Sequence, residues 1–541
     1  MKTPSPEIAL AEYWLMNGEI QKAKVLLTEL TQSNNSEVYA NSLLSQILTH
    51  EGNLSLESGY LDQAIHSYRL SLAKSGTSFE TLHNLGLAHA QLFQYKQASQ
   101  YFKEACSIEP NSFEAQINYG SCLKNLGAYD ESLEHLFQAE KLNPKDARVW
   151  LNKGVTFDAM GLPKDAIQCY EKAITLDAKY LEAYTNKANA FLILGQYEEA
   201  EKSYAAALAL SPSDPDTHYN LAFLQLAQGN YEHGWKNYEY RWLRENAPKK
   251  LFPTIPELTT LNEIKDKQIL IWGEQGLGDT LQFSRYISAL KKLGAHITLA
   301  CQKELIEVLQ GIDGLEKIIS SGDALPHTYD AQASLMSLPF LLQQSHMQEP
   351  EAKPYITSND LKRAEWARKL EKEKKLKVGL VWSGGFRAEQ PELWSVNARR
   401  NIPIEVISKL QHIPGIQFYS LQKGEPAETE LDSQHENIWP SSNLTILAKE
   451  LNNFSDTAAV IENLDLVISV DTSTAHLAGA LGKPVWILNR FDSCWRWLIQ
   501  QEKTRWYPTA TIFNQPALGD WGSVIKNVGA DLRSLVEYSK K

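Results

Sequence analysis

The chain has 541 residues, of which 43% are hydrophobic and 22% charged, and its formal net charge is −12. This length allows about three globular domains. Most of the negative charge lies in residues 1–245, which argues against a nucleic-acid-binding array because such an array needs a basic stripe. The five cysteines form no Cys-x-x-Cys pair, which indicates reduced thiols and a cytoplasmic protein rather than a disulfide framework or a zinc site. No apolar run approaches the roughly 18 residues of a membrane span, and we expect none.

A repeat with a period of 34 residues runs through the first half of the chain. One column contains only small residues: Gly86, Gly120, Gly154, Ala188 and Ala222. A second column contains Tyr95, Tyr129, Pro163, Tyr197 and Tyr231. The pattern resembles the tetratricopeptide repeat, a helix–turn–helix unit in which small residues let paired helices approach closely. We therefore expect an all-α tetratricopeptide-repeat superhelix over residues 1–245, with regular repeats at about 78–242, an atypical cap at 1–77 and an irregular insert near 52–58.

A column of asparagines has the same period and lies on the first helix of each expected pair. Its members are Asn84, Asn118, Asn152, Asn186 and Asn220. An amide both donates and accepts hydrogen bonds, so a ladder of amides can hold an extended peptide without demanding a particular sequence. The eukaryotic O-GlcNAc transferase has a similar ladder in its repeats. The alternative is that asparagine is simply common at this repeat position, and the sequence leaves both interpretations open.

The second half of the chain alternates predicted strands and helices. Residues 246–262 contain prolines and predict a linker, preceded by aromatic residues at 235–242 that we expect to pack between the array and the second half. Strands are predicted at 269–272, 295–301, 316–320, 330–334, 416–422, 464–471 and 484–489, and residues 377–385 are predicted as a second strand that leads into a glycine loop. Such alternation implies α/β lobes with parallel sheets and ligands at the carboxyl ends of the strands. We divide it into lobes at 263–375 and 376–541, with the charged helix at 360–375 crossing between them.

The first chemical motif follows the strand at 269–272. It is a glycine-rich loop, Gly273 to Asp279, that contains Gly276 and Gly278 and leads into a helix. Glycine lets a phosphate or carboxylate approach the unpaired N–H groups of a helix start. The spacing matches neither the dinucleotide fingerprint nor the P-loop, so ATP hydrolysis is disfavoured. Asp279 admits two interpretations: a structural helix cap or a general base at the mouth of a cleft.

The second chemical motif follows the strand at 464–471. Asp471, Thr472, Ser473, Thr474 and His476 stand where this strand leads into a helix rich in small residues. Hydroxyls and backbone N–H groups at a helix start suit a diphosphate. The alternative is ordinary capping by Asp471 or Thr472, and an isolated histidine is more often structural.

Together these motifs carry a resemblance to a known family. Gly-Leu-Gly-Asp-Thr-Leu at 276–281 and Asp-Thr-x-x-x-His-x-Ala at 471–478 resemble the two signatures of glycosyltransferase family nine, the lipopolysaccharide heptosyltransferases. The whole chain is similar to bacterial proteins that fuse tetratricopeptide repeats to such a domain, some of them flagellin glycosyltransferases. The resemblance implies a GT-B fold of two Rossmann-like lobes and an inverting, metal-independent reaction. No Asp-x-Asp metal pair is evident in this half, which is consistent with that expectation. Asp471-Thr472-Ser473 departs from the family's usual Asp-Thr-Gly, which weakens the case for ADP-heptose as donor.

The resemblance also implies roles for individual residues. Asp279 becomes the general base, and the loop with Thr472, Ser473, Thr474 and His476 binds the donor phosphate. A basic residue after the strand and glycine loop at 377–385 often contacts the diphosphate in this family, and the candidates are Arg399 and Arg400, with Arg387 less favoured. Gln422 and Lys423 end a strand where they can meet the nucleotide base, and Trp495 or Arg496 can line the cleft.

The sequence therefore predicts a cytoplasmic protein O-glycosyltransferase that needs a nucleotide-sugar co-substrate and no other cofactor. The acceptor is a serine or threonine of a protein held by the repeats, and flagellin is the first example to consider. The flagellin analogy alone suggests a CMP-linked donor. Two rivals remain: an interaction scaffold with an inactive glycosyltransferase-like domain, and an enzyme of the same fold that acts on a small molecule or glycan.

Overall fold

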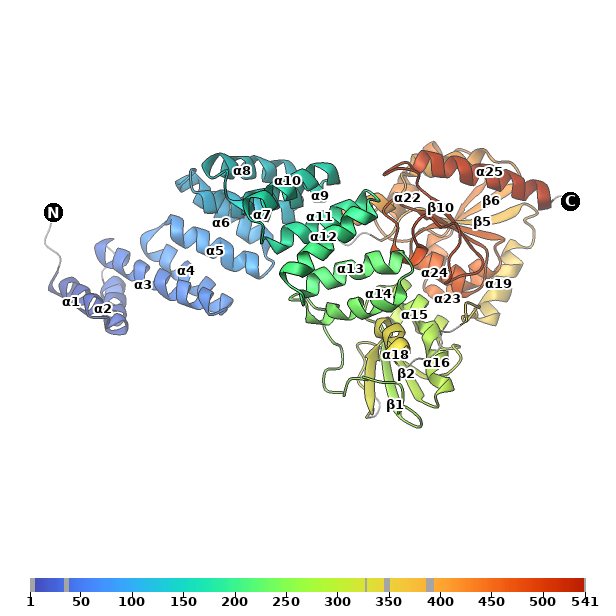
Figure 1. Cartoon of the computed structure of the whole chain (residues 1–541), viewed down its shortest axis with the longest axis horizontal. Helices are drawn as coiled ribbons and strands as arrows, with labels where there is room; N and C mark the ends of the chain where they lie inside the picture. Colours follow the sequence, from blue (N-terminus) through green and yellow to red (C-terminus); the bar gives the residue numbers. More distant parts are fainter. Residues whose placement is uncertain (1–4, 34–37, 326–327, 345–350, 386–393, 540–541) are drawn as a thin grey trace. The chain divides into compact units, whose positions relative to one another are not determined.

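The computed structural model describes residues 5–33, 38–325, 328–344, 351–385 and 394–539 (Figure 1). The chain separates into two compact units, residues 1–186 and residues 187–541. Repeats occupy the first unit and the start of the second, and parallel sheets occupy the rest of the second. No described helix combines the length and the apolar character that crossing a bilayer requires.

The first unit consists of antiparallel helix pairs. The helices are α1 (Pro6–Met16), α2 (Ile20–Ser33), α3 (Val38–Glu57), α4 (Leu61–Ser75), α5 (Phe79–Gln91), α6 (Tyr95–Ile108), α7 (Phe113–Asn125), α8 (Tyr129–Leu142), α9 (Ala147–Ala159) and α10 (Pro163–Leu176), and α11 (Leu181–Ile193) crosses the unit boundary. Every member of the tyrosine and proline column from Tyr95 to Tyr231 is the first residue of a second helix. The 34-residue period thus predicted where each pair turns.

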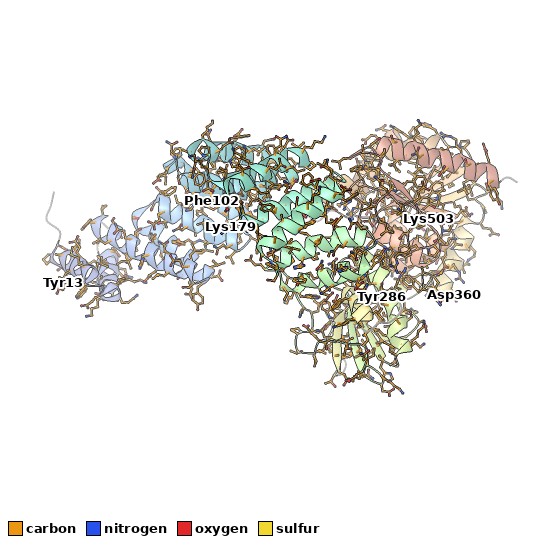
Figure 2. The ribbon with its side chains drawn as sticks, viewed as in Figure 1. Tyr13, Phe102, Lys179, Tyr286, Asp360 and Lys503 are labelled. Atoms are coloured by element: carbon orange, nitrogen blue, oxygen red, sulfur yellow. The ribbon has the colours of Figure 1, made fainter. Side chains whose placement is uncertain are left out.

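The glycine column marks where paired helices touch. A Cβ added at Gly86 would lie 2.7 Å from the ring of Phe102, which is buried on α6 (Figure 2), and one at Gly120 would lie 2.8 Å from Leu136. The predicted insert near 52–58 is wrong, because α3 is helical through Glu57. Gly52 is an earlier member of the same column, in contact with Tyr68, so a glycine that suggested a break is a close-approach position.

The second unit begins with the last repeats. They contain α12 (Tyr197–Leu210), α13 (Pro215–Ala227), α14 (Tyr231–Tyr238) and the 3-10 helix η1 (Glu239–Leu243). The aromatic junction predicted at 235–242 is confirmed: Trp235 is fully buried and packs edge-on against Phe283 and Trp495. Arg241 is also fully buried and pairs with Glu274 of the glycine-rich loop. The last repeat is therefore packed onto the α/β part of its own unit.

The first lobe contains a four-stranded parallel sheet with the order β3-β2-β1-β4. Its strands are β1 (Gln268–Trp272), β2 (His296–Cys301), β3 (Leu315–Ser320) and β4 (Ala331–Ser334), and its helices are α15 (Leu277–Phe283), α16 (Ile287–Lys292), α17 (Ile306–Leu309) and α18 (Leu338–Gln344). The predicted linker pairs with this sheet, since Leu258 N donates to Gln332 O and Gln332 N to Pro256 O, both at 2.8 Å.

The second lobe contains a six-stranded parallel sheet with the order β10-β9-β8-β5-β6-β7. Its strands are β5 (Leu376–Val381), β6 (Ile416–Ser420), β7 (Leu444–Ile446), β8 (Leu466–Val470), β9 (Val485–Asn489) and β10 (Ala510–Asn514). Its helices are α20 (Trp394–Arg400), α21 (Ile404–Ile407), α22 (Ala427–Ile438), α23 (Phe454–Glu462), α24 (Ser473–Ala480) and α25 (Trp521–Ser539). This is the doubly wound order, in which the strand sequence reverses between β5 and β8 and ligands bind at their carboxyl ends.

The charged helix α19 (Asp360–Leu370) lies against both lobes. Its Lys362 Nζ is 2.9 Å from Glu307 Oε1 of the first lobe and 2.8 Å from Asp456 Oδ1 of the second. Two strands lie outside the predicted set: β7, which is three residues long, and β10.

Candidate active site

The two chemical motifs meet at one cavity of about 430 Å³. The glycine-rich loop contributes from the end of β1, Gly384 and Gly385 from the end of β5, and Asp471 to Ser473 from the end of β8. Both sheets thus present their carboxyl ends to the same space, the place where doubly wound sheets bind ligands.

Asp279 lies in this cavity, on the first turn of α15. Its Oδ2 accepts a hydrogen bond of 3.0 Å from the backbone N–H of Gly276, so the carboxylate closes the start of its own helix. Its Oδ1 pairs with Nη2 of Arg496. Burial raises the pKa of the Asp279 carboxyl, and Arg496 acts in the opposite direction. Asp279 therefore caps its helix, as the structural interpretation predicts, and it also lines the cavity.

Gly278 lies at the contact between α15 and α24. A Cβ at this position would be 2.9 Å from Cδ2 of His476. The absence of a side chain therefore lets the two helices approach closely, and the residue also lines the cavity. Gly276 lines it as well and precedes α15.

The second motif forms the start of α24, which also faces the cavity. Thr472 precedes this helix, and its side chain does not cap it. Instead, the Thr472 hydroxyl lies 2.9 Å from Oγ of Ser469. The first N–H groups of a helix lack intrahelical partners. In α24 the N–H groups of Ala475 and His476 donate to the carbonyl of Thr472, which leaves those of Ser473 and Thr474, at the cavity, as the groups that can face an anion.

His476 is a buried residue at the wall of the cavity. It is 4% exposed, its Nδ1 lies 3.0 Å from the hydroxyl of Tyr507, and its ring stacks on Trp497. Its Nε2 lies 3.7 Å from Oδ1 of Asp471. Burial lowers the pKa of His476 to about 3, so the imidazole is neutral at pH 7. Burial acts to raise the pKa of Asp471, but the neighbouring arginines Arg496, Arg400 and Arg490 hold it below its ordinary value.

The three arginine candidates have different positions. Arg400 lines the cavity, donating from Nη1 to Asp471 O at 3.2 Å and from Nη2 to Asn397 Oδ1 at 2.6 Å. Its guanidinium lies where a side chain on Gly384 would have to be. Arg399 lines neither cavity of the site and pairs with Asp492 at 3.0 Å. Arg387 lies outside the described residues.

A second cavity of about 340 Å³ adjoins the first and shares Thr472, Ser473 and Gly384 with it. Lys423 and Thr474 line it, and Lys423 Nζ donates to the carbonyls of Ala448 and Leu451. Gln422 does not line it. The Gln422 amide is 1% exposed and bonds the backbone of Trp382 and Ser383, so it fixes the loop after β5.

The five asparagines all lie on first helices, namely α5, α7, α9, α11 and α13, and all are partly exposed. Some have partners within the array. Asn84 Nδ2 donates to Asn53 Oδ1 at 2.9 Å, Asn118 Nδ2 lies 3.0 Å from Nε2 of His83, and Asn152 Nδ2 donates to the carbonyl of Arg148. These contacts engage the amides of three of the five asparagines.

The sequence predicts Arg496 only as a residue that can line the cleft and does not indicate its partner. The ion pair with Asp279 spans two distant segments of the chain, which sequence spacing cannot reveal. The alternation of Trp495, Arg496 and Trp497 was the available signal, because a cation between two buried tryptophans requires a polar partner. Trp495 itself is a core residue.

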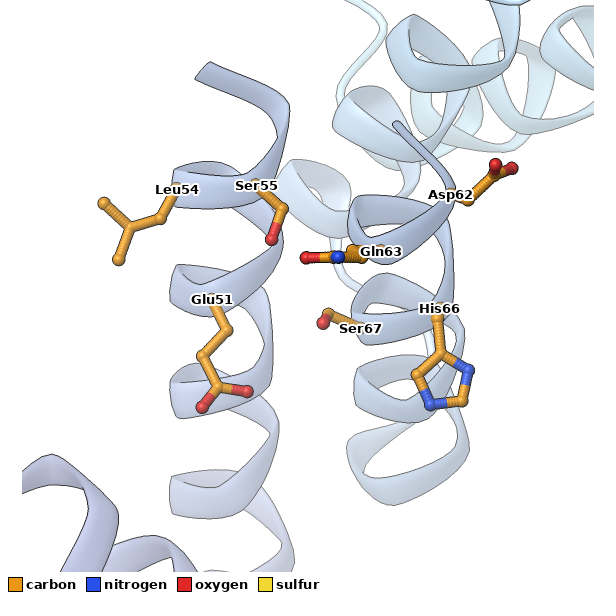
Figure 3. A pocket seen from close by; sticks show the side chains of 7 residues that line it. All are labelled: Glu51, Leu54, Ser55, Asp62, Gln63, His66 and Ser67. Atoms are coloured by element: carbon orange, nitrogen blue, oxygen red, sulfur yellow. The ribbon is translucent and has the colours of Figure 1, made fainter. Parts of the chain in front are cut away.

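A further cavity, of about 540 Å³, lies in the first unit and contains none of the residues of the candidate active site. It lies between α3 and α4 and is lined by Glu51, Leu54, Ser55, Asp62, Gln63, His66 and Ser67 (Figure 3). Glu51 is paired with Lys24 at 2.6 Å. None of these residues belongs to the predicted site. Among the described residues, no group of three or more His, Cys, Asp or Glu side chains is arranged to hold a metal ion.

Family models match two parts of the chain, residues 89–229 and residues 419–488. Models described as tetratricopeptide repeat match residues 89–153, 147–180 and 169–202, and one described as TPR repeat matches 188–229. The model of glycosyltransferase family 9 (heptosyltransferase) matches residues 419–488, which include Asp471 and His476. Asp279 lies outside that match.

A curated relative and several solved structures are also similar. Protein FlbA of Caulobacter vibrioides is 26% identical over 292 residues, which are 50% of this chain and 47% of FlbA. The chain thus spans about half the length of the curated relative that it matches. The crystal structure of MamA protein is 26% identical, covering 31% of this chain and 92% of that chain with a TM-score of 0.29. A tetratricopeptide repeat protein from Parabacteroides merdae is 16% identical, covering 44% and 93%, with a TM-score of 0.37. The chain is a fusion of tetratricopeptide repeats with a glycosyltransferase family 9 domain.

Proposed function

We propose that the protein is an inverting, metal-independent O-glycosyltransferase of GT-B architecture. It transfers a sugar from a nucleotide-sugar donor to a serine or threonine of a protein held by the repeats. The observation that carries the proposal is that Asp279 and the uncapped start of α24 face one cavity of about 430 Å³. A base and an anion site around one space are what glycosyl transfer requires.

The residues suggest how the reaction proceeds. The acceptor hydroxyl oxygen forms a bond to the anomeric carbon of the sugar, and its proton passes to Asp279. The bond from that carbon to the donor phosphate breaks on the opposite face, so the configuration inverts. The phosphate leaves with the bonding electrons toward the N–H groups of α24, and Arg400 adds a positive charge on the same wall of the cavity.

The neighbouring cavity suits the nucleoside of the donor. It adjoins the proposed phosphate position through Thr472 and Ser473 and is lined by Leu421, Phe454 and Thr457. Ligand pockets combine apolar walls with a few polar groups that fix orientation. The nucleotide-sugar is a co-substrate in this proposal, and no other cofactor takes part. A CMP-linked donor belongs in the first set to be tested.

The repeats provide the proposed acceptor site. Repeat arrays present extended surfaces to partners, and the asparagine column supplies partly exposed amides along successive first helices. Flagellin is the acceptor to test first. We also propose a cytoplasmic location, because all five cysteines are free thiols.

Asp279→Asn tests the base directly. The amide keeps the shape and a hydrogen-bond acceptor but cannot take up the proton, so transfer is expected to fall by about 10²–10⁴-fold with nucleotide binding unchanged. Asp456→Asn is the matched control, because Asp456 is also a carboxylate that caps the start of its helix, α23. Equal losses in both variants, or full transfer by Asp279→Asn, would contradict the assignment.

Binding of CMP, UDP, GDP, ADP and dTDP to the whole chain tests the donor site. Selective binding of one nucleotide, weakened by Arg400→Ala, is the expected result. A folded chain that binds none of them would favour the rival interpretation of an interaction scaffold with an inactive domain. Transfer to a small glycan as fast as to any protein would favour the second rival.

The acceptor site is tested by replacing Asn118, Asn152 and Asn186 with alanine. Protein acceptor binding is expected to weaken while nucleotide binding stays unchanged, because the amides lie on repeat helices and not at the cavity. Unchanged acceptor affinity would make the column a structural feature of the repeat.

A further inference from the structure

The guanidinium of Arg496 is held on every side within the candidate active site. Nη2 pairs with Asp279 Oδ1, Nε donates to Gln282 Oε1 at 2.6 Å, and Nη1 donates to Cys494 Sγ at 3.3 Å. Its Cζ lies 4.3 Å from the ring centroid of Trp495. The side chain is 11% exposed. Arg496 therefore has one orientation, and that orientation presents a planar cation to the carboxylate.

This pair joins the two lobes. Asp279 and Gln282 lie on α15 of the first lobe, whereas Arg496 lies on the 3-10 helix η8 (Trp495–Trp497), which follows β9 in the second lobe. The only other hydrogen bond that the structure gives the Asp279 carboxylate comes from the Gly276 N–H of its own loop, among the contacts of the described residues. The first lobe thus caps Asp279, and the second lobe supplies its positive partner.

Other charged groups around Asp279 do not supply that partner. Glu274 of the same loop and Asp471 of the second lobe are negative, and both act to raise the pKa of Asp279. His476 is neutral because burial lowers its pKa to about 3. The phenol of Tyr238 on α14 stays protonated because burial raises its pKa well above the ordinary range. Burial also raises the pKa of Tyr219 on α13.

Arg400, the second arginine of the cavity wall, points elsewhere. It donates to the carbonyl of Asp471 and to Asn397. Removing Arg496 would therefore leave Asp279 buried beside Asp471 and beside Glu274, whose charge is already paired with Arg241. A buried carboxylate without a cation becomes protonated more readily, and a protonated carboxyl cannot accept a proton from the acceptor hydroxyl.

We propose that Arg496 is a positioning residue for Asp279, one that holds the carboxylate ionised and in a single orientation from the opposite lobe. This inference rests on the proposed function, in which Asp279 is the general base. The base is then complete only while the segment that carries Arg496 is packed against α15.

The first test measures the carboxyl group itself and needs neither donor nor acceptor. The chain is labelled with ¹³C at aspartate carboxyl carbons, and the Asp279 resonance is identified by its loss in Asp279→Asn. Its titration is expected to move to higher pH in Arg496→Gln and to stay nearer the wild type in Arg496→Lys, which keeps the charge. Arg505→Gln is the control, because Arg505 is an exposed arginine of the same lobe. An identical titration in wild type and Arg496→Gln would overturn the proposal.

The second test measures transfer against pH. Arg496→Gln is expected to lower the rate by roughly 10- to 100-fold and to move the acidic limb of the profile to higher pH. Arg496→Lys is expected to restore the limb but only part of the rate, since an ammonium cannot reproduce the planar contact. A lowered rate with an unmoved limb would make Arg496 merely structural and overturn the proposal.

The two tests separate this inference from the proposed function. A shifted titration in a chain that transfers no sugar would keep the pair and reject glycosyl transfer. Transfer that depends on Asp279 but is the same in wild type and Arg496→Gln would keep the function and reject the role of Arg496.

Discussion

Gly278→Ala is expected to have two opposing effects on stability: it favours the helix α15, and it introduces a steric clash between α15 of the first lobe and α24 of the second. Alanine in a helix is about 1 kcal/mol more favourable than glycine. The added Cβ, however, would lie 2.9 Å from Cδ2 of His476. That ring cannot move aside easily, because it stacks on Trp497 and contacts the Tyr507 hydroxyl. Overpacking of this kind costs about 1–3 kcal/mol, so the net effect is a loss of up to about 2 kcal/mol.

Gly529→Ala is the matched control for this prediction. Gly529 is a buried residue in the middle of α25, and a Cβ there would have its nearest neighbour, Cδ1 of Ile413, at 3.6 Å, an ordinary contact. The same substitution is therefore expected to stabilise the chain by about 1 kcal/mol. Thermal unfolding of the two variants should shift in opposite directions.

Transfer by the two variants completes the assay. Gly278→Ala moves α15, which carries Asp279, relative to α24, which carries the proposed phosphate site. A misplacement approaching 1 Å can lower a rate by roughly 100-fold, whereas Gly529→Ala should leave transfer unchanged. If Gly278→Ala raised the unfolding temperature and kept full transfer, the close contact of α15 with α24 would not be needed, and the reasoning would be refuted.

Three further predictions concern the junction, the buried histidine and the cavity wall. Trp235→Ala removes a fully buried side chain between Phe283 and Trp495 and should cost about 3–5 kcal/mol, seen as early thermal unfolding, whereas an equal change at exposed Phe93 should cost little. The pKa of His476, about 3, lies below its ordinary value of 6.5. The unfolded chain therefore binds the proton first as pH falls, and stability is lost from about pH 6.5 downward. His476→Gln should flatten that slope in thermal unfolding, and an unchanged slope would contradict the burial argument. Gly384→Ala should displace the Arg400 guanidinium and weaken nucleotide binding in calorimetry, and unaltered affinity would exclude Arg400 from the donor site.

The sequence was informative where a residue pattern recurs along the chain, either as the repeat period or as a polar motif at the end of a strand. The 34-residue period placed the start of each second helix, because Tyr95 and its successors occupy one structural position. Each motif follows a predicted strand, where parallel sheets bind their ligands. The resemblance to a two-lobed family implied that both motifs face one cleft, and Asp279 and Asp471 do line one cavity.

Roles that depend on tertiary neighbours could not be predicted. Gln422 follows a strand of the second lobe, as a base-binding residue would, yet its amide bonds the loop after β5. Arg399 and Arg400 are adjacent in sequence, but successive residues of a helix point in different directions, and only Arg400 faces the cavity. The ion pair of Asp279 with Arg496 depends on the packing of η8 against α15, which no local pattern encodes.

The buried pair between Arg241 and Glu274 has a consequence for how such a protein can change during evolution. Both side chains are fully buried, and Arg241 also bonds Ser337 and Glu239. Replacing Arg241 would leave the buried Glu274 carboxylate without its cation, at a cost of about 3–5 kcal/mol. Whole repeats upstream of α13 can be duplicated or deleted without touching this pair. The segment after the last repeat, which carries Arg241, therefore cannot be exchanged for one without this arginine unless Glu274 changes as well.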